Sequence, residues 1–265
     1  MKNDPKSAWN LEQLSPFGQL IRSVSSGRHL DVVPTSLLKK WIDEHRFVVL
    51  KGFAPLNGTE LPEFCSKLGE VLEWEFGAVN NLRVDPEAKN YLYTNRAVPF
   101  HWDGAFISRS PHYICFHCDV APGPQSGGET LFCDTVRLLT HAPFELEKLW
   151  EEVVITYTTE KIVHYGGTFS SPLITSHPGI HTRVLRYAEP VHDLNPVQLS
   201  ITGIPETEQP EFIKDMHRRL NDERCCFKYQ WESGDVVIAD NHALLHGRRA
   251  FTDQTERHIR RVNVL

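Results

Sequence analysis

Two short stretches of the sequence contain the side chains that the fold must bring together: FHWD at residues 100–103 and DNHALLHGRRAF at residues 240–251. In an extended segment, side chains two positions apart point to the same side, so His101 and Asp103 can converge on one point. In the second stretch, His246 leaves a buried apolar strand predicted at residues 236–240 and precedes a glycine. The sequence thus offers an imidazole and a carboxylate close together, and a second imidazole far along the chain.

Two imidazoles and one carboxylate are the ligands of mononuclear iron(II) sites, which keep three coordination positions open. His101, Asp103 and His246 form such a set. The chain has 14 histidines, so a histidine at a suitable distance is weak support by itself, and an isolated His-x-Asp is more often a surface turn or a hydrogen-bonded pair. His242 lies close to His246, but the spacing to Arg257 favours His246 as the ligand, with His242 in a nearby hydrogen bond.

A pair of arginines follows His246 at positions that share one face of a strand, Arg257 and Arg261. A guanidinium can pair with both oxygens of a carboxylate at once. The alternative is a solvated face, but His258 and Arg260 already provide a polar face for water. A second polar face in a buried strand requires a buried anion.

The remaining sequence is typical of a mostly β protein with flanking helices, because short strands alternate with proline and glycine turns. We predict one domain over residues 1–265, with a mobile loop over the site at residues 161–178. The predicted helices cover residues 37–45, 61–71, 136–150 and 209–221. The predicted strands cover residues 47–53, 91–94, 113–120, 129–134, 153–159, 182–186, 225–230, 236–240 and 259–265.

Composition favours a small-molecule partner. The net charge is -6 with no basic block, which argues against nucleic acid, and no stretch is apolar enough to span a membrane. The N-terminus lacks the apolar core of a signal peptide, so we expect a cytoplasmic protein with reduced thiols at its six cysteines. Cys115 and Cys118 resemble half of a zinc knuckle, but no second pair follows at structural-zinc spacing.

The ordered set of motifs resembles the TauD/TfdA (taurine dioxygenase) superfamily across most of the chain. The resemblance rests on FHWD at residues 100–103, GGET at residues 127–130, DN at residues 240–241, HGR at residues 246–248, Arg257, and the strand VVLKGF at residues 48–53.

This resemblance implies a double-stranded β-helix (jelly-roll, cupin-like) core and an oxidoreductase that uses Fe(II), with 2-oxoglutarate and O2 as co-substrates. By the family pattern His101, Asp103 and His246 are the catalytic metal ligands. Thr130 would bind 2-oxoglutarate by a hydrogen bond, and Arg257 would pair with its distal carboxylate, while Arg261 would face the substrate. Which arginine takes which carboxylate remains open.

The segment YLYTNRAVPFHWDGAF at residues 91–106 looks most like the PvcB-like branch of this superfamily. Those enzymes desaturate or hydroxylate amino-acid-derived isonitriles, such as tyrosine isonitrile, in secondary-metabolite biosynthesis. Phe106 or Tyr93 could wall the substrate pocket, although an aromatic residue is by default part of the core. Asn95, just upstream of the metal pair, is a candidate polar substrate contact. Halogenating relatives replace the metal carboxylate with a small residue, so Asp103 argues against halogenation.

Two other functions are compatible with the same motifs. One is a TauD-like hydroxylase of another small anionic substrate, such as a sulfonate, an ether or an amino acid. The other is a non-catalytic metal-binding β-helix protein, whereas a purely structural protein would not need an intact ligand set. Relatives are frequently dimers or tetramers, so a homo-oligomer is also compatible with the sequence.

Overall fold

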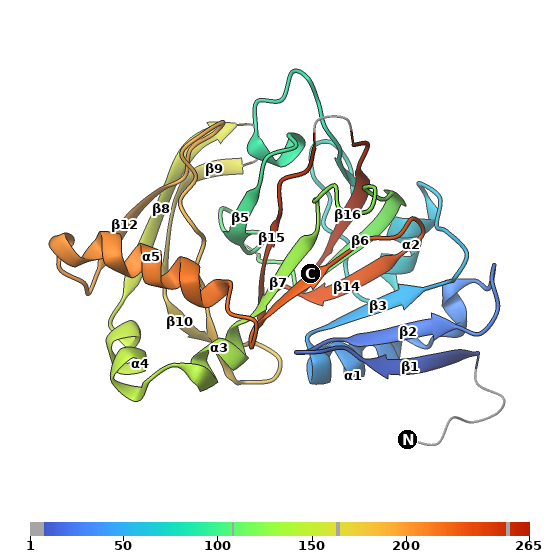
Figure 1. Ribbon diagram of the computed structural model, residues 1–265, viewed down its shortest axis with the longest axis horizontal. Coiled ribbons are helices and arrows are strands. Elements are labelled where there is room, and N and C mark those ends of the chain that lie inside the picture. The colour runs from blue at the N-terminus through green and yellow to red at the C-terminus, as the bar shows by residue number, and fades with distance from the viewer. Residues whose placement is uncertain (1–7, 108, 163–164, 253–254) are drawn as a thin grey trace.

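The computed structural model describes residues 8–107, 109–162, 165–252 and 255–265 (Figure 1). A seven-stranded sheet has the order β1-β2-β3-β14-β6-β16-β4. Its strands are β1 (Trp9–Gln13), β2 (Gln19–Ser23), β3 (Phe47–Lys51), β14 (Val236–Asp240), β6 (Tyr113–Val120), β16 (His258–Val264) and β4 (Asn80–Leu82). A four-stranded sheet consists, in spatial order, of β13 (Cys226–Tyr229), β7 (Thr130–Asp134), β15 (Leu244–Arg248) and β5 (Val98–His101). These two sheets form the predicted jelly-roll core.

Alternating side chains of the buried strands explain why these two sheets pack face to face. Phe47 of β3 points between the sheets and stacks on Phe132 of β7, with ring centroids 5.1 Å apart. Val48 points to the opposite face, where it packs among residues of α1 (Thr35–His45) and α2 (Glu60–Ser66). Because both faces of β3 are covered, the strand is apolar at consecutive positions rather than at alternate ones.

The outer face of the four-stranded sheet is covered by a third layer. It contains a three-stranded sheet of β12 (Gln198–Thr202), β8 (Val154–Ile162) and β9 (Tyr165–Pro172), and a hairpin of β10 (Ile174–Ser176) and β11 (Arg183–Leu185). Helices α3 (Thr135–His141), α4 (Phe144–Glu151) and α5 (Gln209–Leu220) lie on the same side of the molecule (Figure 1). Three short 3-10 helices, η1 (Leu30–Val32), η2 (Tyr91–Tyr93) and η3 (Glu206–Glu208), complete the elements.

Three predicted elements were wrong. Residues 91–94 form η2 rather than a strand, because the Asn90 side chain accepts a hydrogen bond from the Leu92 amide and starts a turn. The helix predicted over residues 136–150 is two helices, since Pro143 forces Ala142 into an extended conformation. The mobile loop predicted at residues 161–178 is largely strand: β9 pairs with β8 along its length, although residues 163–164 lie outside the described residues.

Other elements were predicted closely. The strands at residues 113–120 and 236–240 are β6 and β14 with the predicted bounds, and the helix predicted at 209–221 is α5. The helix predicted at 61–71 is α2, which ends at Ser66, before Gly69. All six cysteines are free and buried. Among the described residues no helix is both long enough and apolar enough to cross a membrane.

Candidate metal centre and substrate cavity

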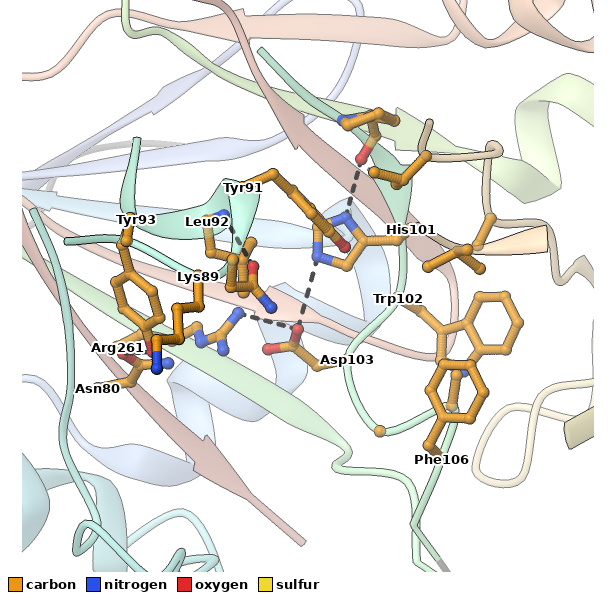
Figure 2. Close-up of a pocket in the computed structure, with 18 of the residues that line it drawn as sticks. Asn80, Lys89, Tyr91, Leu92, Tyr93, His101, Trp102, Asp103, Phe106 and Arg261 are labelled. Atoms are coloured by element: carbon orange, nitrogen blue, oxygen red, sulfur yellow. Dashed lines mark hydrogen bonds and ion pairs between the residues drawn. The ribbon is translucent and has the colours of Figure 1, made fainter. Parts of the chain in front are cut away.

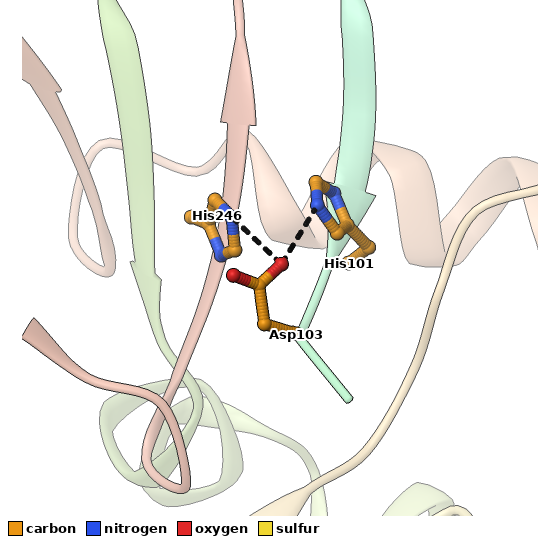
Figure 3. A group of neighbouring side chains, drawn as sticks. All are labelled: His101, Asp103 and His246. Atoms are coloured by element: carbon orange, nitrogen blue, oxygen red, sulfur yellow. Dashed lines mark ion pairs between the residues drawn. The ribbon is translucent and has the colours of Figure 1, made fainter. Parts of the chain in front are cut away.

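The three predicted metal ligands meet at the edge of the four-stranded sheet (Figure 3). His101 ends β5 and is paired in register with His246 of the neighbouring strand β15. Asp103 follows two residues after His101, and its Oδ1 lies 3.7 Å from His101 Nε2 and 3.8 Å from His246 Nε2. One ligand atom from each residue lies within 4.8 Å of the other two. The strand pairing therefore brings two histidines together that are far apart in the sequence.

The protonation states of these residues suit a divalent metal. Burial lowers the pKa of His101 and holds that of His246 well below its usual range, so both imidazoles are neutral. His101 Nδ1 lies 2.9 Å from the Pro99 carbonyl, to which it can only donate, and this leaves Nε2 with a lone pair. Burial would raise the pKa of Asp103, but the charge of Arg261 and the hydrogen bond from Asn263 favour the carboxylate, and the pKa is lowered. Two neutral nitrogens and one carboxylate fit iron(II).

Two asparagines to which the sequence analysis assigned no role hold Asp103 in place. Asn241 accepts a hydrogen bond from the Asp103 amide at 2.9 Å and donates to the carbonyls of Asp103, at 2.9 Å, and Pro111, at 2.8 Å. Asn263 donates to Asp103 Oδ2 at 2.8 Å, and Arg261 donates to Oδ1 at 2.9 Å. Asn263 lies two residues after Arg261 in β16, so the two-residue strand period could have indicated it.

A second histidine cluster contacts the turn at residues 240–243, which carries Asn241, and holds that turn in place. His112, His177 and Asp240 offer ligand atoms within 4.8 Å of one another. However, His177 Nδ1 accepts from the amides of Gly179 and Ile180, so its proton is on Nε2, which donates to Asp240 Oδ2 at 2.9 Å. A metal would have to displace that proton. The Asp240 carboxylate also accepts from the amides at residues 242 and 243, and these bonds shape the turn that carries Asn241.

His242 does not belong to the group formed by His101, Asp103 and His246. Its Nδ1 takes a short hydrogen bond from Arg186, which confirms that His242 is engaged in a nearby hydrogen bond. Burial and Arg186 together lower the pKa of His242 to about 3. A neutral imidazole with one nitrogen committed to a guanidinium is a poor metal ligand.

A small cavity of about 30 Å³ adjoins the metal group and contains the predicted co-substrate residues. His246, Thr130, Arg257 and Arg261 line it. Thr130 Oγ1 accepts from Trp231 Nε1 at 2.9 Å, which leaves its hydroxyl proton available as a donor. Arg257 is only 4% exposed, and its Nε donates to the Gly128 carbonyl at 3.0 Å.

Arg257 is the clearest sign of a missing anion. Burial lowers its pKa to about 9, so the cation is unfavourable where it lies. Within the part of the chain that the structure describes, its two terminal nitrogens have no hydrogen-bond acceptor or carboxylate partner. A buried guanidinium needs such a partner. The donor set of Arg257 and Thr130 fits the carboxylate of a dicarboxylic acid.

A larger cavity of about 610 Å³ opens on the other side of His101 and Asp103 (Figure 2). In Figure 2 the aromatic side chains of Trp102 and Phe106 lie on one side of these two ligands. The polar side chains lie on the other side, and they are those of Asn80, Lys89, Tyr93 and Arg261. The cavity therefore has an aromatic wall and a polar wall that includes two cations, with the metal ligands between them.

The predicted substrate contacts are only partly placed together. Tyr93 and Phe106 line the large cavity, and the Tyr93 hydroxyl donates to Asn80 Oδ1 at 3.1 Å. Arg261 lines both cavities. Asn95 does not line the large cavity; it is bonded through its backbone and side chain to Phe251. Asn95 therefore supports the loop beside the cavity, and a substrate contact there stays a prediction.

Two further arginines have structural roles. Arg248 is 7% exposed and donates to the carbonyls of Leu92, Thr94 and Arg96 at 3.0, 2.6 and 2.7 Å, which fixes the segment that walls the cavity. Arg260 was expected to face water and does not. It is buried, forms an ion pair with Asp119 of the neighbouring strand β6, and donates to the carbonyls of Leu56 and Asn57, which cover that face.

Comparison with known proteins gives a consistent result. The model of the family described as "Taurine catabolism dioxygenase TauD, TfdA family" matches residues 11–263. A 3-((Z)-2-isocyanoethenyl)-1H-indole synthase of Fischerella ambigua is 40% identical, over 99% of this chain and 97% of that protein. A tyrosine isonitrile desaturase of Pseudomonas aeruginosa is 34% identical, over 94% of this chain and 87% of that protein.

Solved structures agree in fold. One described as PvcB, an Fe, alpha-ketoglutarate dependent oxygenase from an isonitrile synthetic pathway, superposes with a TM-score of 0.83 at 31% identity, covering 99% of this chain and 94% of that chain. A taurine dioxygenase from Burkholderia xenovorans has a TM-score of 0.74 at 18% identity, covering 97% of this chain and 91% of that chain, and supports the fold alone. Since the family model spans nearly all of the sequence and near-full-length relatives exceed 30% identity, the chain belongs to the taurine catabolism dioxygenase TauD, TfdA family.

Proposed function

We propose that this chain is an Fe(II)- and 2-oxoglutarate-dependent dioxygenase that desaturates an aromatic amino-acid-derived isonitrile. The observation that carries the proposal is the arrangement around His101, which lines two different cavities. One is small and contains the buried guanidinium of Arg257, whose two terminal nitrogens have no partner among the described residues. The other is large and has an aromatic wall. A metal held there would face a dicarboxylate on one side and an aryl substrate on the other.

Each residue would have a defined task in this reaction. His101, Asp103 and His246 would hold the iron, and Arg257 and Thr130 would bind the distal carboxylate of 2-oxoglutarate. Bound iron, with 2-oxoglutarate and O2, supplies the oxidising power to remove hydrogen from an unactivated carbon. The aromatic wall would hold the substrate ring and exclude water from the reacting carbon.

The name of the Fischerella relative's product suggests the outcome. That product carries the isonitrile on a carbon–carbon double bond and has no carboxyl group. An isonitrile made from an amino acid has a carboxylate on the carbon that bears the isonitrile. The carboxylate form of the substrate loses CO2, one proton from the neighbouring carbon and two electrons to give the alkene. 2-Oxoglutarate and O2 take up the two electrons, that proton and one more from solvent, and become succinate, CO2 and water. We propose this decarboxylative desaturation for the present chain.

We also propose that residues 1–265 act as one dioxygenase domain. Both sheets contribute to the site: His101 and His246 come from the four-stranded sheet, whereas Arg261 and Asn263 come from β16 of the seven-stranded sheet. If the chain were divided into two domains between the sheets, Asp103 would be separated from Arg261 and Asn263, which bond to its carboxylate.

The test begins without oxygen. Iron(II) and 2-oxoglutarate are added to the metal-free protein, and the visible charge-transfer band of a 2-oxo acid chelated to ferrous iron is recorded. We expect the band in the wild type and not in Asp103→Ala. Isonitriles derived from tryptophan and tyrosine are then supplied with O2, and alkene, alcohol and succinate are quantified.

Alkene formed in a one-to-one ratio with succinate would support the proposal. An alcohol as the main product would replace desaturation with hydroxylation. Succinate formed at the same slow rate with and without either isonitrile would refute the substrate class, and absence of the band in folded, metal-loaded protein would refute the enzyme class.

A further inference from the structure

We propose that Lys89 is the residue that binds the substrate's carboxylate, a role that the family pattern would give to Arg261. This inference rests on the proposed function, because it concerns the acid group of an amino-acid-derived isonitrile. The reacting carbon is one bond away from the carbon that bears the carboxylate. The cavity must therefore neutralise a negative charge near the metal.

Only two lysine or arginine side chains line the large cavity among the residues that the structure describes, Lys89 and Arg261. Arg261 is bound to a metal ligand through one nitrogen: it is 7% exposed, its Nη1 donates to Asp103 Oδ1 at 2.9 Å, and its buried Nε has no hydrogen-bond partner among the described residues. Its charge is also a main reason why the pKa of Asp103 is lowered. Transfer of this guanidinium to a substrate would remove compensation from a buried metal ligand, which is costly.

Lys89 is free of such a commitment. No carboxylate in the described part of the chain lies within ion-pairing distance of its ammonium, although Glu75, Asp85 and Glu87 line the same cavity. Lys89 precedes η2 in the connection between β4 and β5, and its four-carbon side chain can adjust its reach. Its exposed position allows a substrate to exchange with water there.

The arrangement of the cavity favours one orientation of the substrate. Figure 2 shows Lys89 beside Asn80 and Tyr93, on the opposite side of the metal ligands from Trp102 and Phe106. A molecule whose carboxylate lies at Lys89 and whose aryl ring lies against Trp102 and Phe106 would place the carbons between them near the metal ligands. These are the carbons that the proposed reaction must oxidise.

The chemistry also suits a lysine better than an arginine at this position. A guanidinium holds both oxygens of a carboxylate in a fork, whereas an ammonium acts as a compact point charge. The proposed reaction releases this same carboxylate as CO2. A partner that holds the group by charge, in a partly exposed position, steers the substrate without resisting that release.

The test separates binding from catalysis. Lys89→Met removes the charge and keeps an unbranched side chain. We expect KM for the isonitrile acid to rise about 10- to 150-fold, the range for loss of one charge-assisted hydrogen bond. We expect kcat to stay within about threefold of wild type, and Lys89→Arg to restore KM. Lys40→Met, which alters an exposed lysine of α1 outside the cavity, is the matched control.

A second measurement does not depend on turnover. The isonitrile acid and its neutral primary amide are titrated anaerobically into the protein loaded with iron and 2-oxoglutarate, and the shift of the visible band reports binding. Wild type is expected to prefer the acid, and Lys89→Met is expected to lose most of that preference.

The outcomes distinguish the two proposals. If wild type oxidises the isonitrile acid while Lys89→Met keeps both its KM and its preference for the acid over the amide, the role of Lys89 is refuted and the proposed function stands. If wild type neither binds nor oxidises isonitrile acids, the proposed function fails and the role of Lys89 fails with it.

Discussion

Replacement of Arg257 by methionine is expected to stabilise the protein without 2-oxoglutarate and to abolish its stabilisation by 2-oxoglutarate. Burial lowers the pKa of Arg257 from 12.5 to about 9. At about 1.4 kcal/mol per pH unit, this corresponds to roughly 4–5 kcal/mol of cost for keeping the cation there. Methionine removes this cost but leaves the Gly128 carbonyl without its donor, which costs about 1–3 kcal/mol.

The net gain for Arg257→Met, after relaxation of the surroundings, is about 1–2 kcal/mol, or about 2–8 °C in Tm for a chain of this size. The same change removes two charge-assisted hydrogen bonds to the co-substrate, so Kd for 2-oxoglutarate should rise roughly 10²- to 10³-fold. At 100 times the wild-type Kd, 2-oxoglutarate stabilises wild type by about 2.7 kcal/mol and should barely affect the variant.

Arg248 provides a matched control, because its exposed fraction, 7%, is close to the 4% of Arg257. Burial also lowers its pKa, to about 10. However, Arg248 satisfies three backbone carbonyls, those of Leu92, Thr94 and Arg96. Arg248→Met would orphan all three, and we expect a net loss of about 2–4 kcal/mol.

Differential scanning fluorimetry of metal-loaded protein, with and without 2-oxoglutarate, measures both effects. Equal destabilisation by Arg257→Met and Arg248→Met would show that Arg257 is structural. A Tm rise with 2-oxoglutarate that is as large in Arg257→Met as in wild type would refute the assignment of its partner.

Three further predictions concern the metal centre and its surroundings. Asn241→Ala should weaken metal binding about 10- to 100-fold, because it frees the Asp103 backbone; a cobalt(II) titration followed by visible absorption measures this, and unchanged affinity would contradict the role. His246→Ala should abolish cobalt(II) binding while His242→Ala preserves it, and the reverse result would overturn the ligand assignment. The pKa of His242 is lowered from 6.5 to about 3 in the folded protein. As pH drops below about 6.5, His242 is therefore protonated in the unfolded chain but not in the folded one, and the free energy of unfolding falls. Between pH 7.0 and 5.5 this should cost about 1 kcal/mol, and urea unfolding of His242→Gln should lack that part of the loss.

The parts of the site that follow a local spacing rule were predictable from the sequence. His101 and Asp103 share one side of an extended segment, and Arg257 and Arg261, four positions apart, both line the small cavity. The strands β6 and β14 were predicted closely because their apolar runs end at recognisable turns. In each case the information lies within a few neighbouring residues.

The parts that depend on tertiary contacts were not predictable. Arg260 looked exposed because the strand alternates, and only the position of Asp119 on β6 shows that its face is covered. Asn241 bonds to a residue that is distant in sequence, and Lys89 was not noticed because a lysine in a loop is usually solvated. Residues 161–178 looked like a loop because glycine, serine and threonine are common in turns, yet Thr156 and Ser170 pair across the strands.

The strand that carries His101 is also the edge of its sheet, and this position links iron supply to solubility. β5 is bonded to β15 on one side, through a ladder interrupted by a register shift. On its other side, Glu189 bonds both the amide and the carbonyl of Phe100, at 2.8 and 2.9 Å. An edge strand that comes loose exposes backbone groups to which another chain can pair. A metal held by His101 and His246 would tie this edge to its neighbour, so we expect the metal-free protein to aggregate more readily than the metal-loaded protein.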